Sequence, residues 1–275
     1  MKKIALLIVF FNLWYLVGCS KSEDTSTQPN FIATAKNEME EAIARERGEE
    51  YLRQHGIDVT NKNKALFYWI ARGDLDTVSA LLAVGADPIS SGEDGITPLM
   101  EACFFGGDVL KQRDPGIVRL LLEAGADPNA VDQEGVTALL LAINYAQYET
   151  IPLLLQAGAN PNIKNDAGKT PLHYSRESNI VRALLEAGAE PNTRDSEGQT
   201  PLLSMLSYLN NNSHFYDPVY GEPKYRADAK ELITLLLKYG ADPNISDKKG
   251  NTPLQFARNI DENLVNLLKQ AGAKE

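Results

Sequence analysis

A short glycine motif recurs along the chain and strongly limits what the chain can fold into. Glycine followed by alanine, then usually an acidic or amide residue and proline, is typical of a helix end. The glycine adopts a left-handed conformation, and the proline prevents the helix from continuing. Copies begin at Gly85, Gly125, Gly158, Gly188 and Gly240, and Gly272-Ala273 is a shortened copy. A helix end repeated at intervals of 30 to 52 residues predicts an array of similar units.

A second motif, Thr-Pro-Leu, predicts where the units begin. Threonine is a good N-cap, whose hydroxyl can accept a hydrogen bond from a free amide one turn on, and proline fits the first helical position. In segment 166–192 the second helix carries Val181, Leu184 and Leu185 at helical spacing, which gives it one apolar face. Because neither helix of a unit can bury such a face alone, the units must stack. The predicted helix starts are at Thr97, Thr170, Thr200 and Thr252, with Thr137 as a variant.

A period near ~33 residues, paired helices and the Thr-Pro-Leu-His sequence at 170–173 resemble the ankyrin-repeat family over residues 61–275. The resemblance implies an all-α solenoid of about six helix-turn-helix repeats joined by β-hairpin-like loops. Residues 33–60 are helical in pattern, charged and sparsely apolar, which predicts an N-terminal capping helix. His55-Gly56-Ile57-Asp58 would be a divergent helix end. The fold by itself says little about function.

The first 18 residues form a separate segment. Two lysines precede an apolar run that is shorter than the roughly 20 residues of a membrane-spanning helix, which is typical of a signal peptide. Leu16-Val17-Gly18-Cys19 resembles the lipobox of bacterial lipoproteins, in which the cysteine becomes the lipidated first residue. The resemblance implies a lipid-anchored envelope protein, and Ser20 favours the outer membrane facing the periplasm. The alternatives are an uncleaved anchor or a plain signal peptide.

Residues 19–32 are mostly polar and predict a flexible tether between the lipid and the domain.

The charge of the chain restricts its partners. The net charge of −10 opposes binding to nucleic acid and to anionic lipid through the protein surface. We therefore expect membrane association through the lipid anchor alone, and another protein as partner. Cys103, the remaining cysteine, is expected to be a buried small side chain.

Two surfaces are candidates for binding that protein. In the ankyrin family the first helices line a concave face, and each repeat places an aromatic residue there, with Glu101 and Glu177 beside them. Such a row can equally be packing between neighbouring helices. Its aromatic members are Tyr68, Phe104, Phe105, Tyr145, Tyr174, Tyr208 and Phe256.

The second candidate surface is an insertion. Extra residues at about 106–115 and 210–228 fall between the first and second helices of their repeats. The longer insertion is rich in aromatic residues, which favours recognition, whereas surface loops also tolerate insertion without any function. Its candidate binding residues are His214, Phe215, Tyr216, Tyr220 and Tyr225.

Catalytic chemistry finds little support in the sequence. His55, His173 and His214 show no metal-ligand spacing, and the resemblance gives His173 a structural role at the helix start. No phosphate-binding glycine loop or nucleophile motif is present, so we expect no catalytic residues, metal or cofactor. Two functions stay open. One is an immunity or inhibitor protein that neutralises a toxic effector, and the other is a scaffold for envelope complexes.

Overall fold

The computed structural model describes residues 28–104, 114–211 and 224–274. All regular elements in these residues are helices, which confirms the predicted all-α class. Contacts divide the chain into two bodies, of which the first comprises residues 1–66 and 76–87, and the second residues 67–75 and 88–275. Within the described ranges, no helix is both long and apolar enough to span a bilayer.

The first body contains the helix predicted to cap the repeats. Helix α2 spans Gln28–Gln54, so it begins inside the segment predicted as tether. It is followed by α3 (Lys62–Arg72), whose first residues belong to this body, and by α4 (Leu75–Ala83). Gly56 has φ 64°, and the Ile57 amide donates to the Leu52 carbonyl at 2.9 Å. The divergent helix end predicted at residues 55–58 is therefore confirmed.

Helix α2 approaches α4 closely at a glycine. Most described side chains of α2 are exposed, and Gly48 and Leu52 are buried. A Cβ atom on Gly48 would lie 2.9 Å from the Ala80 carbonyl oxygen and 3.2 Å from Val84. Because the backbone of α4 cannot yield as a flexible side chain can, the two helices approach this closely only with glycine at position 48.

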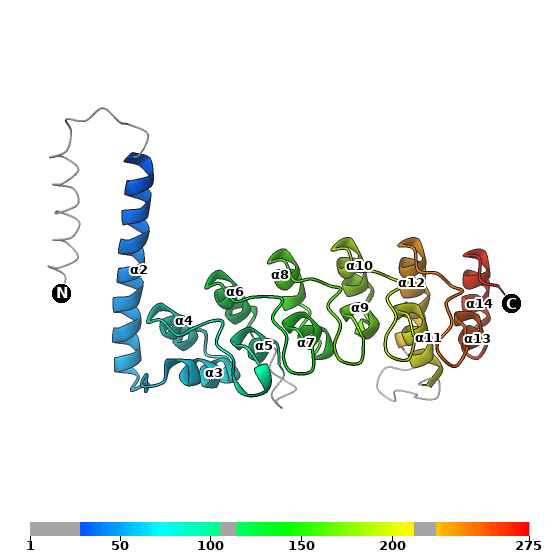
Figure 1. The fold of residues 1–275 in the computed structure, drawn as a ribbon, viewed down its shortest axis with the longest axis horizontal. Helices are drawn as coiled ribbons and strands as arrows, with labels where there is room; N and C mark the ends of the chain where they lie inside the picture. The colour runs from blue at the N-terminus through cyan, green and yellow to red at the C-terminus, as the bar shows by residue number, and fades with distance from the viewer. Residues whose placement is uncertain (1–27, 105–113, 212–223, 275) are drawn as a thin grey trace. The chain divides into compact units, whose positions relative to one another are not determined.

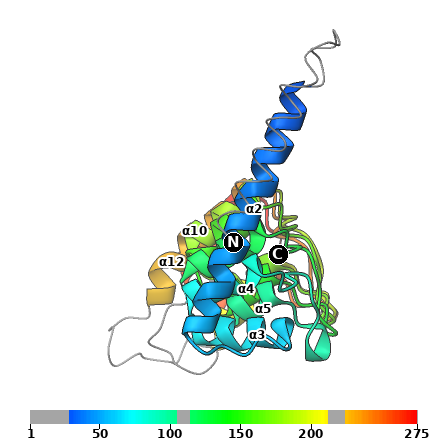
Figure 2. The same cartoon turned by 90° about the vertical axis from the view of Figure 1, so that its left-hand side faces the viewer.

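The second body is a stack of helix pairs. The first helices lie side by side in one row and the second helices in another (Figure 1). The hairpin loops that precede the first helices gather along one edge (Figure 2). The first helices are α5 (Pro98–Cys103), α7 (Ala138–Asn144), α9 (Pro171–Tyr174), α11 (Pro201–Asn211) and α13 (Pro253–Arg258). The second helices are α6 (Pro115–Glu123), α8 (Thr150–Gln156), α10 (Ser178–Glu186), α12 (Lys224–Lys238) and α14 (Glu262–Gln270).

The recurring motifs act as predicted at both ends of the helix pairs. The hydroxyls of Thr97 and Thr137 accept hydrogen bonds from the amide three residues on, each at 3.2 Å. The leucine that follows each start enters the core, and Gly188 ends α10 with φ 87°. The five leucines, each at most 1% exposed, are Leu99, Leu139, Leu172, Leu202 and Leu254. Cys103 is buried, as expected.

Backbone hydrogen bonds join each hairpin to the next. The Gln133 amide donates to the Asp94 carbonyl, and the Ser196 amide donates to the Ala167 carbonyl, each at 2.9 Å. A short 3₁₀ helix, η1 (Glu93–Gly95), forms the first of these hairpin tips. Gly168, at φ 72°, allows the close approach, because a Cβ atom there would lie 2.9 Å from the Ser196 amide nitrogen.

An asparagine side chain makes a second connection between repeats. The amide group of Asn162 donates to the Gly188 carbonyl at 2.9 Å, and its carbonyl oxygen accepts from the Glu190 amide at 2.8 Å. The asparagine therefore binds both sides of the next helix end, and we call this pairing the asparagine clamp. Equivalent clamps are made by Asn129, Asn192 and Asn244 on the repeats that follow them.

The two insertions lie where they were predicted, between α5 and α6 and between α11 and α12. Their predicted bounds were too wide, however. Asp114 is the N-cap of α6 and Pro115 its first residue. Helix α11 continues to Asn211 and α12 begins at Lys224, so both ends of the 210–228 segment are helical rather than loop. The missed extension of α12 is rich in helix-forming lysine, arginine and alanine, a signal that the apparent loop composition obscured.

We predict that Asn162→Ala lowers the free energy of unfolding by about 1–3 kcal/mol, because it leaves two backbone groups of the next repeat without a protein partner. Asn266→Ala is the matched control. Asn266 is exposed on α14. Its replacement should change stability by less than about 0.5 kcal/mol or improve helix propensity slightly. Urea unfolding measures both variants, and equal stabilities would contradict the structural role of the clamp.

Candidate functional site

The outward positions of the first helices carry the aromatic residues predicted to form a binding face. Phe104 and Tyr145 follow the last residues of α5 and α7, which are neighbours in the row. Their ring centroids lie 5.0 Å apart with an interplanar angle of 71°, an edge-to-face pair. The two side chains are 38% and 37% exposed. The structure thus brings together these two predicted residues and leaves both accessible.

The turn after Tyr145 is strained. Ala146 has φ 54°, in the left-handed region that costs an alanine roughly 1–2 kcal/mol. The next amide, of Gln147, donates to the Ala142 carbonyl at 2.8 Å and the Gln147 side chain is buried, which holds the turn in place. The side chain of Tyr148, which follows the turn, is 38% exposed. Strain of this kind is often found at functional sites.

Other aromatic residues of the row contact cationic side chains of the same chain. The Arg72 guanidinium lies 4.7 Å from the centre of the Tyr68 ring, and Tyr68 is 52% exposed. Lys169 Nζ lies 5.5 Å from the Tyr174 ring, and the Arg176 guanidinium 4.9 Å from the Tyr208 ring. Tyr174, Tyr208 and Phe256 are half-buried. The row therefore combines half-buried members with exposed ones, and its role in binding stays a prediction.

The cationic partners were not predicted from the sequence, although a signal was present. Arg72 lies four residues after Tyr68 in α3, the spacing at which helical side chains meet. Arg176 is held by its own donors, because its Nη1 donates to the carbonyls of His173 and Ser175 at 2.9 Å each. Burial lowers the pKa of the Arg176 guanidinium, which arginine tolerates without losing its charge near neutral pH.

Several predicted site residues lie outside the described residues. They comprise the proposed lipidation site Cys19, Phe105 beside Phe104, and four residues of the long insertion: His214, Phe215, Tyr216 and Tyr220. Tyr225 lies on α12, in the part whose side chains are not described. Glu101 and Glu177 are half-buried on the row. The role of each of these residues stays a prediction.

His173 connects one repeat to the next hairpin. Its Nδ1 accepts from the Thr170 amide at 3.1 Å, and its Nε2, 3.1 Å from the Gln199 carbonyl oxygen, donates to it. The Thr170 hydroxyl lies 2.9 Å from Nδ1, and Thr170 and His173 form a capping box at the start of α9. Burial lowers the pKa of His173. The imidazole is therefore neutral, and both of its nitrogens take part in hydrogen bonds within the fold.

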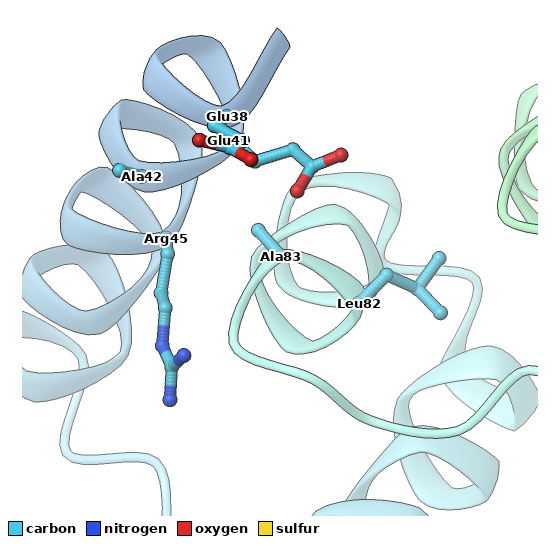
Figure 3. A pocket seen from close by; sticks show the side chains of 6 residues that line it. All are labelled: Glu38, Glu41, Ala42, Arg45, Leu82 and Ala83. Atoms are coloured by element: carbon cyan, nitrogen blue, oxygen red, sulfur yellow. The ribbon is translucent and has the colours of Figure 1, made fainter. Parts of the chain in front are cut away.

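A shallow groove lies within the first body, between α2 and α4 (Figure 3). Its volume is about 530 Å³, and Glu38 and Glu41 lie toward its upper end, with Arg45 lower on α2. Ala42, Leu82 and Ala83 complete the lining. Across the described ranges, no three His, Cys, Asp or Glu side chains gather in a way that could hold a metal ion. The groove offers charge and apolar surface for contact, and it holds no nucleophile–base pair.

The second body is a stack of helix pairs, and its row of first helices exposes Phe104 and Tyr145. Residues 32–132 and 109–195 match the family described as ankyrin repeats (3 copies). The chain belongs to the ankyrin-repeat family. This family generally mediates binding between proteins and is typically non-enzymatic.

A solved relative agrees with the family match. The crystal structure of an ankyrin repeat domain from Acinetobacter baumannii is 30% identical, with a TM-score of 0.63. The match covers 76% of this chain and 98% of that one. Among curated proteins, none matches the chain.

We predict that His173 makes stability depend on pH. Its pKa is lowered in the folded state, so the unfolded chain binds a proton more readily. Stability is therefore present above the ordinary pKa of about 6.5 and is lost as pH falls below it. From about pH 7.5 to about pH 5.5, wild type should lose up to about 1.4 kcal/mol more than His173→Gln. Denaturant unfolding at both pH values tests this, and parallel losses in the two proteins would contradict it.

Proposed function

We propose that this protein is a non-enzymatic, protein-binding ankyrin-repeat lipoprotein of the bacterial envelope. The observation that carries the binding role is the exposed edge-to-face pair of Phe104 and Tyr145 on adjacent repeats. Large aromatic side chains exposed together are the residues on which binding energy concentrates in protein interfaces. The lipobox-like sequence ending at Cys19 supports export and lipid anchoring.

We propose further that the partner is a toxic effector and that the chain is its immunity protein or inhibitor. A strongly acidic chain suits a basic partner, since opposite charges accelerate association. An inhibitor needs one good surface placed against its target, and a rigid stack of repeats provides such a surface without enzymatic groups. We propose the long insertion, which is rich in aromatic residues, as a second contact for the same partner.

A scaffold for envelope complexes is the second candidate. The groove between α2 and α4 favours it, because a scaffold requires at least two separate binding surfaces. The two functions differ in what happens to the partner. An inhibitor abolishes the activity of one protein, whereas a scaffold holds several proteins and leaves their activities intact.

The test uses the full chain and its Cys19→Ala variant in the native host. Wild type should sediment with membranes and carry an acylated N-terminus, and Cys19→Ala should be released or remain an unprocessed precursor. Wild-type protein that is wholly soluble with an unmodified N-terminus would rule out the lipoprotein proposal.

The same extracts identify the function. Crosslinking and capture through wild type should yield one dominant protein, and stoichiometric addition of the chain should abolish the toxicity of that protein. Phe104→Ala together with Tyr145→Ala should weaken the complex at least about tenfold, equivalent to about 1.4 kcal/mol. Replacement of residues 212–223 by a short glycine-containing turn separates the two surfaces. Capture of several active proteins would favour the scaffold, and capture of none would overturn the binding function.

A further inference from the structure

The aromatic pair belongs to hairpins and first helices whose charged residues are all acidic. Residues 88–104 and 126–149 comprise the hairpins and first helices of two adjacent repeats, with the connection after α7, and they contain no lysine or arginine. The hairpin tips are exposed at Glu93, Asp94 and Glu134. The acidic residues of the two segments are Glu93, Asp94, Glu101, Asp127, Asp132, Glu134 and Glu149.

The later repeats differ in charge. Lys164 and Lys169 lie in the hairpin before α9, Arg194 in the next, and Lys248 and Lys249 in the hairpin before α13. Arg194 donates from Nη2 to the Ser246 carbonyl at 2.8 Å, so part of this positive charge joins one hairpin to another. The absence of cations is therefore a local property of the hairpins and first helices at 88–104 and 126–149, and does not follow simply from the net charge.

The row itself shows which group these aromatic rings take as a partner. Tyr68, Tyr174 and Tyr208 each have a cationic side chain of this chain 4.7 to 5.5 Å from the ring centre. The Phe104–Tyr145 pair has no such contact in the described part of the chain. The hairpins and first helices at 88–104 and 126–149 contain no lysine or arginine, whereas Lys111 and Arg113 follow Phe104 in segment 105–113. An exposed ring face attracts a cation through its quadrupole, and nearby carboxylates strengthen the attraction.

We propose that the Phe104–Tyr145 pair receives an arginine guanidinium from a cationic segment of the partner protein. The inference rests on the proposed binding function and specifies its site and its chemistry. Arginine fits better than lysine, because its planar and weakly hydrated group can stack on a ring while its N–H groups reach carboxylates such as Glu134 or Asp94. Nucleic acid is repelled by the same carboxylates. A second copy of this acidic chain would suffer net repulsion as well.

The test measures binding of a fluorescent 12-residue peptide of alternating arginine and serine to the full chain in neutral detergent. A citrulline peptide of the same length is the control, since citrulline keeps the shape of arginine without its charge. The arginine peptide should bind at least about fivefold more tightly than the citrulline peptide, and the difference should shrink as salt screens the charges.

Two sets of variants locate the contact. Phe104→Leu and Tyr145→Leu keep apolar bulk and remove the rings, and they should weaken binding of the arginine peptide at least about fivefold. Tyr208→Leu is the matched control on the same row, because its ring already contacts Arg176, and it should change affinity less than about twofold. Thermal unfolding of each variant confirms that it is folded before its affinity is compared.

Equal affinity for the two peptides, or equal effects of the Tyr208 and Phe104 variants, would overturn the inference. Concentration-dependent self-association that the peptide fails to displace would also overturn it and indicate a second copy as occupant. The result is separable from the proposed function. A captured partner that tolerates Phe104→Leu and Tyr145→Leu removes the inference alone, whereas failure to capture any protein removes the function and leaves the peptide result standing.

Discussion

The asparagine clamp is the contact on which the regular stack depends. Each clamp uses one side chain to bind a carbonyl and an amide at the helix end of the next repeat, as Asn192 does with Gly240 and Asp242 at 2.8 Å each. Both groups belong to the backbone, so the clamp fixes the position of one repeat against the next independently of side-chain identity. Hydrogen bonds between successive hairpins are a second constraint on the position of one repeat against the next. Stacked repeats bury their apolar faces against one another, and these polar contacts set the register in which they do so.

The candidate site follows from this register. Because α5 and α7 are held side by side, the residues that follow them meet, and Phe104 and Tyr145 form an edge-to-face pair on the surface. The two residues are far apart in the sequence and meet only because their repeats are adjacent in the stack. The clamp has one exception in the second body, where Ile89 occupies the position that asparagine holds in the following hairpins. Its hydrocarbon side chain is 61% exposed and cannot hydrogen-bond to Gly125 or Asp127.

The fold was predictable in detail because each repeat contains the same local signals for the start, the end and the buried face of its helices. Thr-Pro-Leu starts, glycine ends and buried leucines such as Leu184 follow from capping and periodicity, and the structure has them as predicted. Contacts between repeats were harder to predict. The aromatic row was predicted, but the division into rings such as Tyr208 with an internal cation and rings without one depends on three-dimensional neighbours. The clamp was also missed, although the recurrence of asparagine at 129, 162, 192 and 244 was its signal.

Amide hydrogen exchange tests the central role of the clamp most directly. The amides of Asn160, Glu190 and Asp242 each donate to a clamp oxygen at 2.7 to 2.8 Å. The amide of Asp127 lies at the equivalent place opposite Ile89. We expect the three clamped amides to exchange at least about tenfold more slowly than that of Asp127, and Ile89→Asn to protect Asp127 to a similar degree. Equal protection of all four amides in wild type, with no change at Asp127 in the variant, would contradict the account.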